Sequence, residues 1–167
     1  MMRLLLLLLV VSAVSARDVP FFPTKFPLVE VMLDLAQVGL SDVVYDLGCG
    51  DGRIVIGAAR RGARGVGVEL DPVLVKLSLQ NVREARVGEL VEIRQGDLFQ
   101  ADIHDATVIA IYLLPQINAR LRPKLERELP AGTKVVSHAF PIEGWTPLET
   151  RMVGKEKLML YEVKAPG

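Results

Sequence analysis

The chain has 167 residues, of which 50% are apolar, and it balances 20 basic against 20 acidic side chains. This length corresponds to one domain with an ordinary hydrophobic core. One cysteine and two histidines exclude an intramolecular disulfide framework and a cysteine-cluster zinc site, and they argue against a histidine-rich metal site. The zero net charge argues against binding to nucleic acid through the overall field, so we expect no metal and no nucleic-acid partner, with only a local basic patch left open.

The first 16 residues form a leader. Residues 1–16 have a basic start at Arg3, an apolar stretch over 4–11 and small residues ending at Ala16. This pattern is typical of a cleavable signal peptide. The apolar stretch is shorter than the ~20 residues with which a helix crosses hydrocarbon, so a membrane anchor is the second interpretation and a mis-assigned start the third. We expect residues 17–167 to form the domain, and the leader to direct export or association with a membrane.

The rest of the chain alternates between helical and strand patterns. Apolar residues at helical spacing predict a first helix over 28–35, and the continuous apolar run 42–47 is typical of a strand buried on both faces of a parallel sheet. Pro123 is expected to break a later helix. The other predicted elements are a helix at 54–61, a strand at 65–70, a helix at 73–85, strands at 90–94 and 107–112, a helix at 116–129, a strand at 133–138 and a hairpin of strands 148–153 and 157–164.

This alternation predicts a doubly wound α/β domain with a mostly parallel sheet. Ligands of such sheets bind beyond the carboxyl ends of the strands. We therefore expect the chemistry of this protein in the turns that follow the first four strands.

The turn after the first strand carries the clearest ligand signal. It reads Asp-Leu-Gly-Cys-Gly-Asp-Gly-Arg over 46–53, and its alternate glycines let the backbone approach a ligand closely. Arg53 stands where a dinucleotide motif places its third glycine, and Asp46 and Asp51 would repel a pyrophosphate. NAD or FAD is therefore the second interpretation, and a structural turn without ligand the third. The acidic flanks suit a ligand with an ammonium group and hydroxyls, such as S-adenosylmethionine.

Two further acids follow the next strands. Glu69 ends the second strand, 23 residues after Asp46, where an acid can accept hydrogen bonds from both ribose hydroxyls. Asp97 follows the third strand, where it could accept a hydrogen bond from an adenine amino group while Leu98 and Phe99 pack on the ring. The alternatives are a solvated acid at a strand end and an ordinary Gly-Asp turn.

The motif at 46–52, together with Glu69 and the Gly96-Asp97 pair, resembles the class I S-adenosylmethionine-dependent methyltransferase family over residues 23–164. The resemblance implies a single Rossmann-like domain whose doubly wound, seven-stranded and mostly parallel sheet ends in an antiparallel hairpin. It implies S-adenosylmethionine as cofactor, with Thr24 at its methionine end. The expected cofactor-binding residues are Thr24, Asp46, Gly48, Cys49, Gly50, Glu69, Asp97 and Leu98.

Three shorter motifs resemble a small subgroup of this class that includes the lysine methyltransferase of the ATP synthase c-subunit. They are Pro23-Thr24, the run 112–115 and Ser137-His138. The resemblance implies Nε methylation of a protein lysine, and we expect direct displacement with Tyr112 orienting the amine. Packing on the core is the alternative for Tyr112. His138 is expected to be a hydrogen-bonded strand residue, with acceptance of a proton from the lysine ammonium as the alternative, and Asn118 is expected to be a residue of the helix surface.

Other functions stay open. Methylation of a small molecule is one, and a non-catalytic nucleotide-binding module of the same fold is another. The leader favours the non-catalytic module, because S-adenosylmethionine is made in the cytoplasm and an exported domain would lack it. For an active enzyme, the supply of cofactor favours a domain that faces the cytoplasm. The run 112–115 stands where nucleic-acid amino methyltransferases carry their Asn/Asp-Pro-Pro-aromatic motif. The single cysteine, Cys49, lies in the cofactor turn, which excludes C5-pyrimidine methylation by a cysteine nucleophile.

Overall fold

The computed structural model describes residues 22–165, so the leader predicted at 1–16 lies outside the described residues. Within 22–165, no helix has the length and apolar character needed to cross a bilayer.

Helices and strands follow one another in the predicted order, within one or two residues at most ends. The elements are α1 (Phe26–Leu35), β1 (Val43–Leu47), α2 (Arg53–Arg60), β2 (Arg64–Glu69), α3 (Pro72–Glu84), β3 (Val91–Gln95), β4 (Val108–Ile111), α4 (Pro115–Glu128), β5 (Lys134–His138), β6 (Glu149–Val153) and β7 (Glu156–Glu162).

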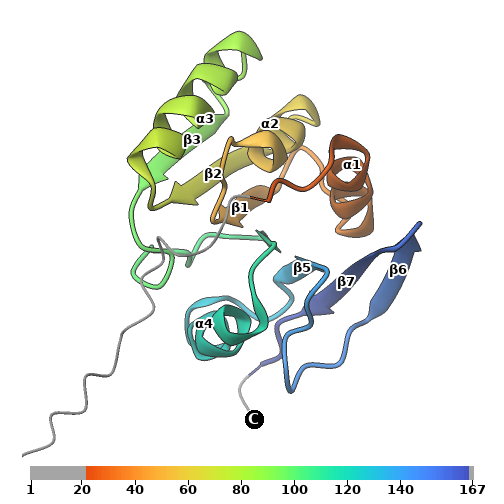
Figure 1. Ribbon diagram of the computed structural model, residues 1–167. Helices are drawn as coiled ribbons and strands as arrows, with labels where there is room; N and C mark the ends of the chain where they lie inside the picture. Colours follow the sequence, from red (N-terminus) through yellow and green to blue (C-terminus); the bar gives the residue numbers. More distant parts are fainter. Residues whose placement is uncertain (1–21, 166–167) are drawn as a thin grey trace, which may run out of the picture.

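A seven-stranded sheet runs through the centre of the molecule (Figure 1). Its strand order is β3-β2-β1-β4-β5-β7-β6; the first five strands are parallel, and β7 is antiparallel to both β5 and β6. The predicted doubly wound α/β domain with a terminal antiparallel hairpin is confirmed. The order reverses between β1 and β4, which is where sheets of this kind bind their ligands.

Two apolar clusters cover the two faces of the sheet. On one face α1 and α2 pack against the central strands, and α3 lies beside α2 over β2 and β3. On the other face α4 packs against the sheet through Leu121 and Leu125. Because both faces are covered, β1, β4 and β5 are almost entirely buried, as their continuous apolar runs predict.

The break predicted at Pro123 is wrong, because α4 runs through this residue without interruption. Proline removes one backbone donor from a helix and crowds the preceding turn. Leu121 and Leu125, on either side of it, are both fully buried in the core. Their packing holds the two halves of the helix in line and outweighs the cost of the proline.

Candidate active site

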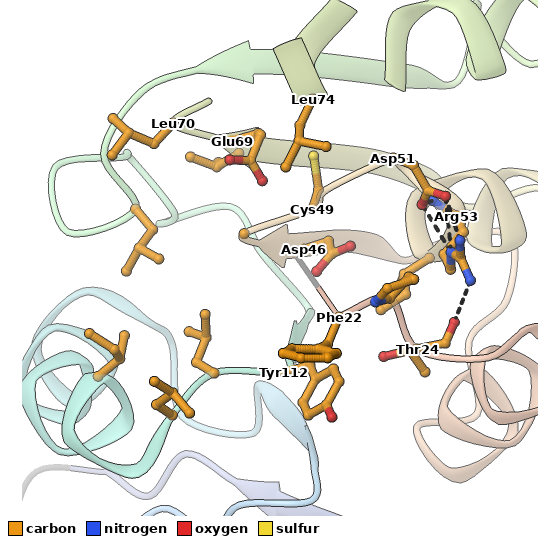
Figure 2. Close-up of a pocket in the computed structure, with 18 of the residues that line it drawn as sticks. Phe22, Thr24, Asp46, Cys49, Asp51, Arg53, Glu69, Leu70, Leu74 and Tyr112 are labelled. Atoms are coloured by element: carbon orange, nitrogen blue, oxygen red, sulfur yellow. Dashed lines mark hydrogen bonds and ion pairs between the residues drawn. The ribbon is translucent and has the colours of Figure 1, made fainter. Parts of the chain in front are cut away.

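A cavity of about 430 Å³ lies at the carboxyl ends of the parallel strands. Its walls come from the segment before α1, from the turns after β1 to β4 and from the turn after β5. Seven of the eight residues predicted to bind the cofactor line it, as does Tyr112. These residues are Thr24, Asp46, Gly48, Cys49, Glu69, Asp97, Leu98 and Tyr112, many of which are labelled in Figure 2.

The glycine turn is tied to the neighbouring strand. The N–H groups of Gly48 and Cys49 both donate to the carbonyl of Val68, at 2.8 and 3.0 Å. Gly48 has φ 91° and Gly52 has φ 81°, values in the left-handed region that favours glycine. The turn thereby reaches α2 in six residues and leaves its backbone facing the cavity. Burial raises the pKa of the Cys49 thiol, so this sulfur stays protonated and is a poor nucleophile.

Glu69 is the residue that joins the turn to the rest of the site. Its Oε2 accepts a hydrogen bond from the N–H of Gly50 at 2.9 Å, and its Oε1 accepts one from the N–H of Asp71 at 2.9 Å. Gly50, the one predicted cofactor residue that does not line the cavity, thus acts on it through Glu69. A carboxylate oxygen has two lone pairs, so each oxygen keeps one for a ligand hydroxyl.

Asp46 is a buried acid in the wall of the cavity. Burial raises the pKa of its carboxyl to about 8, and the nearby charges of Glu69 and Asp51 add to the effect. Asp46 therefore holds a proton at neutral pH when no cation is near. A cationic ligand would favour the ionised form, so this position is built to respond to positive charge.

Arg53 is the single cationic side chain that lines the cavity in the described part of the chain. Its Nε donates to Asp51 at 2.9 Å, and its Nη1 donates to the carbonyl of Thr24 at 2.9 Å. The guanidinium also lies over the ring of Phe26, at 4.7 Å from its centroid. A guanidinium carries five N–H groups, so donors remain for a ligand carboxylate. Arg53 is absent from the predicted site. Its position at the start of α2, directly after the glycine turn, is the feature of the sequence that could have indicated it.

Asp97 forms the turn of its Gly-Asp pair and also lines the cavity. Its Oδ1 accepts a hydrogen bond from the N–H of Phe99 at 2.9 Å, which forms the turn. The residue also lines the cavity together with Leu98 and Phe99, so an acceptor and two apolar side chains meet there. The guanidinium of Arg120 lies over the Phe99 ring, at 3.9 Å from its centroid.

Aromatic side chains form the opposite end. Tyr112 lines the cavity and packs on His138, with ring centroids 4.0 Å apart, and on Phe140, at 6.4 Å. Figure 2 shows Phe22 at the same end as Tyr112, and Phe22 is 69% exposed. Tyr112 therefore packs on its neighbours and lines the cavity at once. Phe22 and Phe140 are absent from the predicted site because no local motif marks them.

The structure confirms that His138 is a hydrogen-bonded strand residue and contradicts the surface position predicted for Asn118. His138 is buried in β5, with Nδ1 3.1 Å from Thr24 Oγ1 and Nε2 3.2 Å from Glu156 Oε2. Asn118 is 1% exposed, not on the helix surface. Its Nδ2 donates to the carbonyls of Phe140 and Pro141, both at 3.3 Å, and so fixes the turn that carries Phe140.

Metal ligands are not grouped in this structure: within residues 22–165, no three His, Cys, Asp or Glu side chains are placed to hold an ion. The cavity instead has polar acceptors for a nucleoside at one end and an aromatic wall at the other. Strand order, hairpin and acid-flanked glycine turn together define a Rossmann-like methyltransferase of class I.

Comparison with known proteins places the chain within this class. It belongs to the family described as the ANTKMT methyltransferase domain, whose model matches residues 46–149. A protein-lysine N-methyltransferase of Saccharolobus islandicus (strain REY15A) is 46% identical over 133 residues, which are 78% of this chain and 83% of the relative. The adenine nucleotide translocase lysine N-methyltransferase of Mus musculus is 34% identical over 151 residues, 90% of this chain and 66% of the mouse protein.

A solved structure gives a third comparison. The crystal structure of an RNA methyltransferase from Salinibacter ruber in complex with S-adenosyl-L-homocysteine is 52% identical, with a TM-score of 0.86. The match covers 87% of this chain and 96% of that one. The relatives thus agree on methyl transfer, and their names differ in the acceptor.

Proposed function

We propose that this protein transfers a methyl group from S-adenosylmethionine to the side-chain amine of a protein lysine. The observation that carries the proposal is the cavity with two unlike ends, one lined by acids and a glycine turn and the other by aromatic rings. The 46% identity to a protein-lysine N-methyltransferase supports this choice of acceptor.

The donor set fits the cofactor group by group. Glu69 keeps free lone pairs for the ribose hydroxyls, and Asp97 offers an acceptor for the adenine amino group. Asp46 suits the positive charge of the methionine portion. Arg53 is placed to bind the carboxylate, since it is the cation of the described cavity lining. When bound, the cofactor supplies an electrophilic methyl on a sulfonium.

The aromatic end would hold the acceptor. Tyr112 presents a ring face and a hydroxyl to an entering amine, and Phe22 and Phe140 add apolar walls along a lysine stem. These side chains exclude water and fix the direction of approach. Holding two reactants in near-attack geometry supplies about 7–11 kcal/mol of the barrier reduction, so positioning is the main contribution of the chain.

RNA is the second candidate acceptor, because the similar Salinibacter ruber structure carries that name. Four acidic side chains line the cavity (Asp46, Asp51, Glu69 and Asp97) against one arginine. Such a lining attracts an ammonium and repels a phosphate backbone. The charge of the cavity lining therefore favours lysine.

The test is transfer of label from methyl-tritiated S-adenosylmethionine to total cell protein, to total RNA and to the small-molecule fraction. We expect label in protein, recovered as methyl-lysine after acid hydrolysis, and no label with Glu69→Ala. Recovery in RNA or in small molecules would replace the acceptor. Tight cofactor binding with no transfer to any fraction would instead indicate a non-catalytic module.

A further inference from the structure

Three side chains form a continuous hydrogen-bonded series that starts at the cavity wall. Thr24 lines the cavity, and its Oγ1 lies 3.1 Å from Nδ1 of His138. Nε2 of His138 lies 3.2 Å from Oε2 of Glu156, at the start of β7. The His138 side chain is 3% exposed and that of Glu156 34% exposed. The series therefore runs from the cavity through the core to the surface.

The charge of Glu156 fixes the direction of the hydrogen bonds. The hydrogen bond from His138 and the nearby ammonium of Lys25, 3.6 Å away, hold the pKa of Glu156 below its ordinary value. An ionised carboxylate only accepts, so Nε2 of His138 carries a hydrogen and Nδ1 of the neutral ring is an acceptor. The Thr24 hydroxyl then donates to Nδ1, which leaves the lone pairs of Oγ1 for a donor in the cavity.

We propose that Thr24, His138 and Glu156 act as a proton-accepting triad for the acceptor amine. The proposal rests on the proposed function, because only an amine acceptor brings this proton. A free lysine has a pKa of ~10.4, so roughly one molecule in 10³ is neutral at pH 7. An ammonium has no lone pair, and a proton must leave nitrogen before the methyl can be attacked.

The proton transfer balances within the triad. The ammonium gives a proton to Oγ1 of Thr24 while the Thr24 hydroxyl proton moves to Nδ1 of His138. The electron pair of the broken N–H bond stays on the acceptor nitrogen, which becomes the nucleophile. The imidazolium keeps its Nε2–H on Glu156, whose negative charge stabilises it. After the product leaves, the proton returns through Thr24 to water in the cavity.

The surroundings of His138 put the triad beside the acceptor end. The Tyr112 ring packs on the imidazole, so Thr24 and Tyr112 contact the same side chain and both line the cavity. Figure 2 shows one oxygen of Thr24 bonded to Arg53 and the other directed toward Tyr112. Among residues 22–165, the titratable and charged groups that contact the triad are Tyr112 on the His138 ring, Lys25 beside Glu156 and Arg53 on the Thr24 carbonyl.

The first test compares turnover of a lysine peptide as a function of pH in Glu156→Gln, Thr24→Val and Thr24→Ser. Glu156 is half-exposed, so its variant is expected to fold. We expect Glu156→Gln and Thr24→Val to lower kcat near neutral pH by about 10²-fold, with Thr24→Ser close to wild type. The deficit should shrink as pH approaches the lysine pKa. A peptide with the less basic S-aminoethylcysteine should rescue both variants.

The matched control is Glu149→Gln, which removes a carboxylate from the same hairpin that pairs with Arg151 alone. It should follow the wild-type profile. The triad is overturned if the loss of kcat in Glu156→Gln is absent or stays constant over the whole pH range. In that case, lysine methylation by the wild type still upholds the proposed function. If wild type methylates RNA and no amine, both proposals fail.

The second test does not depend on activity. The chain has two histidines, so His104→Gln leaves His138 as the single source of imidazole ¹⁵N signals. In the His104→Gln protein we expect Nε2 of His138 to carry a hydrogen and Nδ1 to carry none. Adding Glu156→Gln should shift the Nε2 signal. The opposite tautomer would overturn the proposal, because Thr24 would then not donate to the ring.

Discussion

The two ends of the cavity are held in different ways. At the cofactor end, Glu69 is fixed by backbone N–H groups of Gly50 and Asp71, and the glycine turn by the carbonyl of Val68. At the acceptor end, the contacts of His138 with Thr24, Glu156 and Tyr112 join one side chain to another. Backbone contacts survive substitution of most side chains, whereas the acceptor end changes with each of its residues. The same fold therefore accommodates one cofactor and different acceptors.

The largest effect is expected from Glu69→Ala. The change removes the ribose acceptor and frees two backbone N–H groups, so the Kd for S-adenosylmethionine should rise by about 10²-fold or more. Isothermal titration measures it, with exposed Glu89→Ala as the control. Unchanged affinity would mean that the cofactor end is not where we place it.

Asp46 predicts a pH dependence of cofactor binding. Burial and the neighbouring acids raise its pKa to about 8, and a bound cation would lower the pKa again, so binding releases a proton. Affinity should rise by up to about tenfold per pH unit as pH increases toward 8, and Asp46→Asn should remove the slope. Titrations in buffers of different ionisation enthalpy report the proton directly. A flat wild-type profile would contradict the assignment.

The unliganded protein should show the opposite trend. The ordinary pKa of the Asp46 carboxyl is 3.8, and in the folded state it is about 8. Between these values the folded state holds a proton that the unfolded chain has released, so the free energy of unfolding falls as pH rises. Thermal unfolding over this range checks the sign, and Asp46→Asn should flatten this contribution.

Gly67 tests the support beneath the cofactor end. A Cβ at this position on β2 would lie 2.7 Å from Cys49 Sγ and 2.9 Å from Ile93 Cδ1. Gly67→Ala should therefore lower the free energy of unfolding by about 1–3 kcal/mol and weaken cofactor binding through the displaced turn. Gly88→Ala, where a Cβ meets no atom within 4 Å, is the control for thermal unfolding.

The smallest effect is expected at the acceptor end. Tyr112→Ala should raise the KM for the protein acceptor by about tenfold and leave the Kd for the cofactor unchanged, because the ring belongs to the acceptor end of the cavity. Tyr112→Phe keeps the ring and should retain most of the affinity. Steady-state kinetics with varied acceptor separates the two constants. An equal loss of cofactor affinity would mean that the two ends are not independent.

The fold was largely predictable because its signals are local. Buried strands are continuous apolar runs, and the turn over 46–53 contains its own glycines. The acceptor end was less predictable because its contacts join distant parts of the chain: Thr24 and His138 are separated by 114 positions. Asn118 did have a signal, since it shares helical spacing with the buried Leu121 and Leu125. Its polar side chain favoured a position facing solvent, but in the structure its Nδ2 donates to the carbonyls of Phe140 and Pro141 in the turn after β5.

The position of Glu156 so late in the chain has a consequence for biosynthesis. A ribosome makes residues 46–97, with most of the cofactor end, well before it makes β7. The nascent chain therefore contains its nucleoside-binding groups before Glu156 is available to accept a hydrogen bond from His138. If the proposed triad serves the acceptor amine, the protein becomes competent for methyl transfer only when β7 pairs with β5.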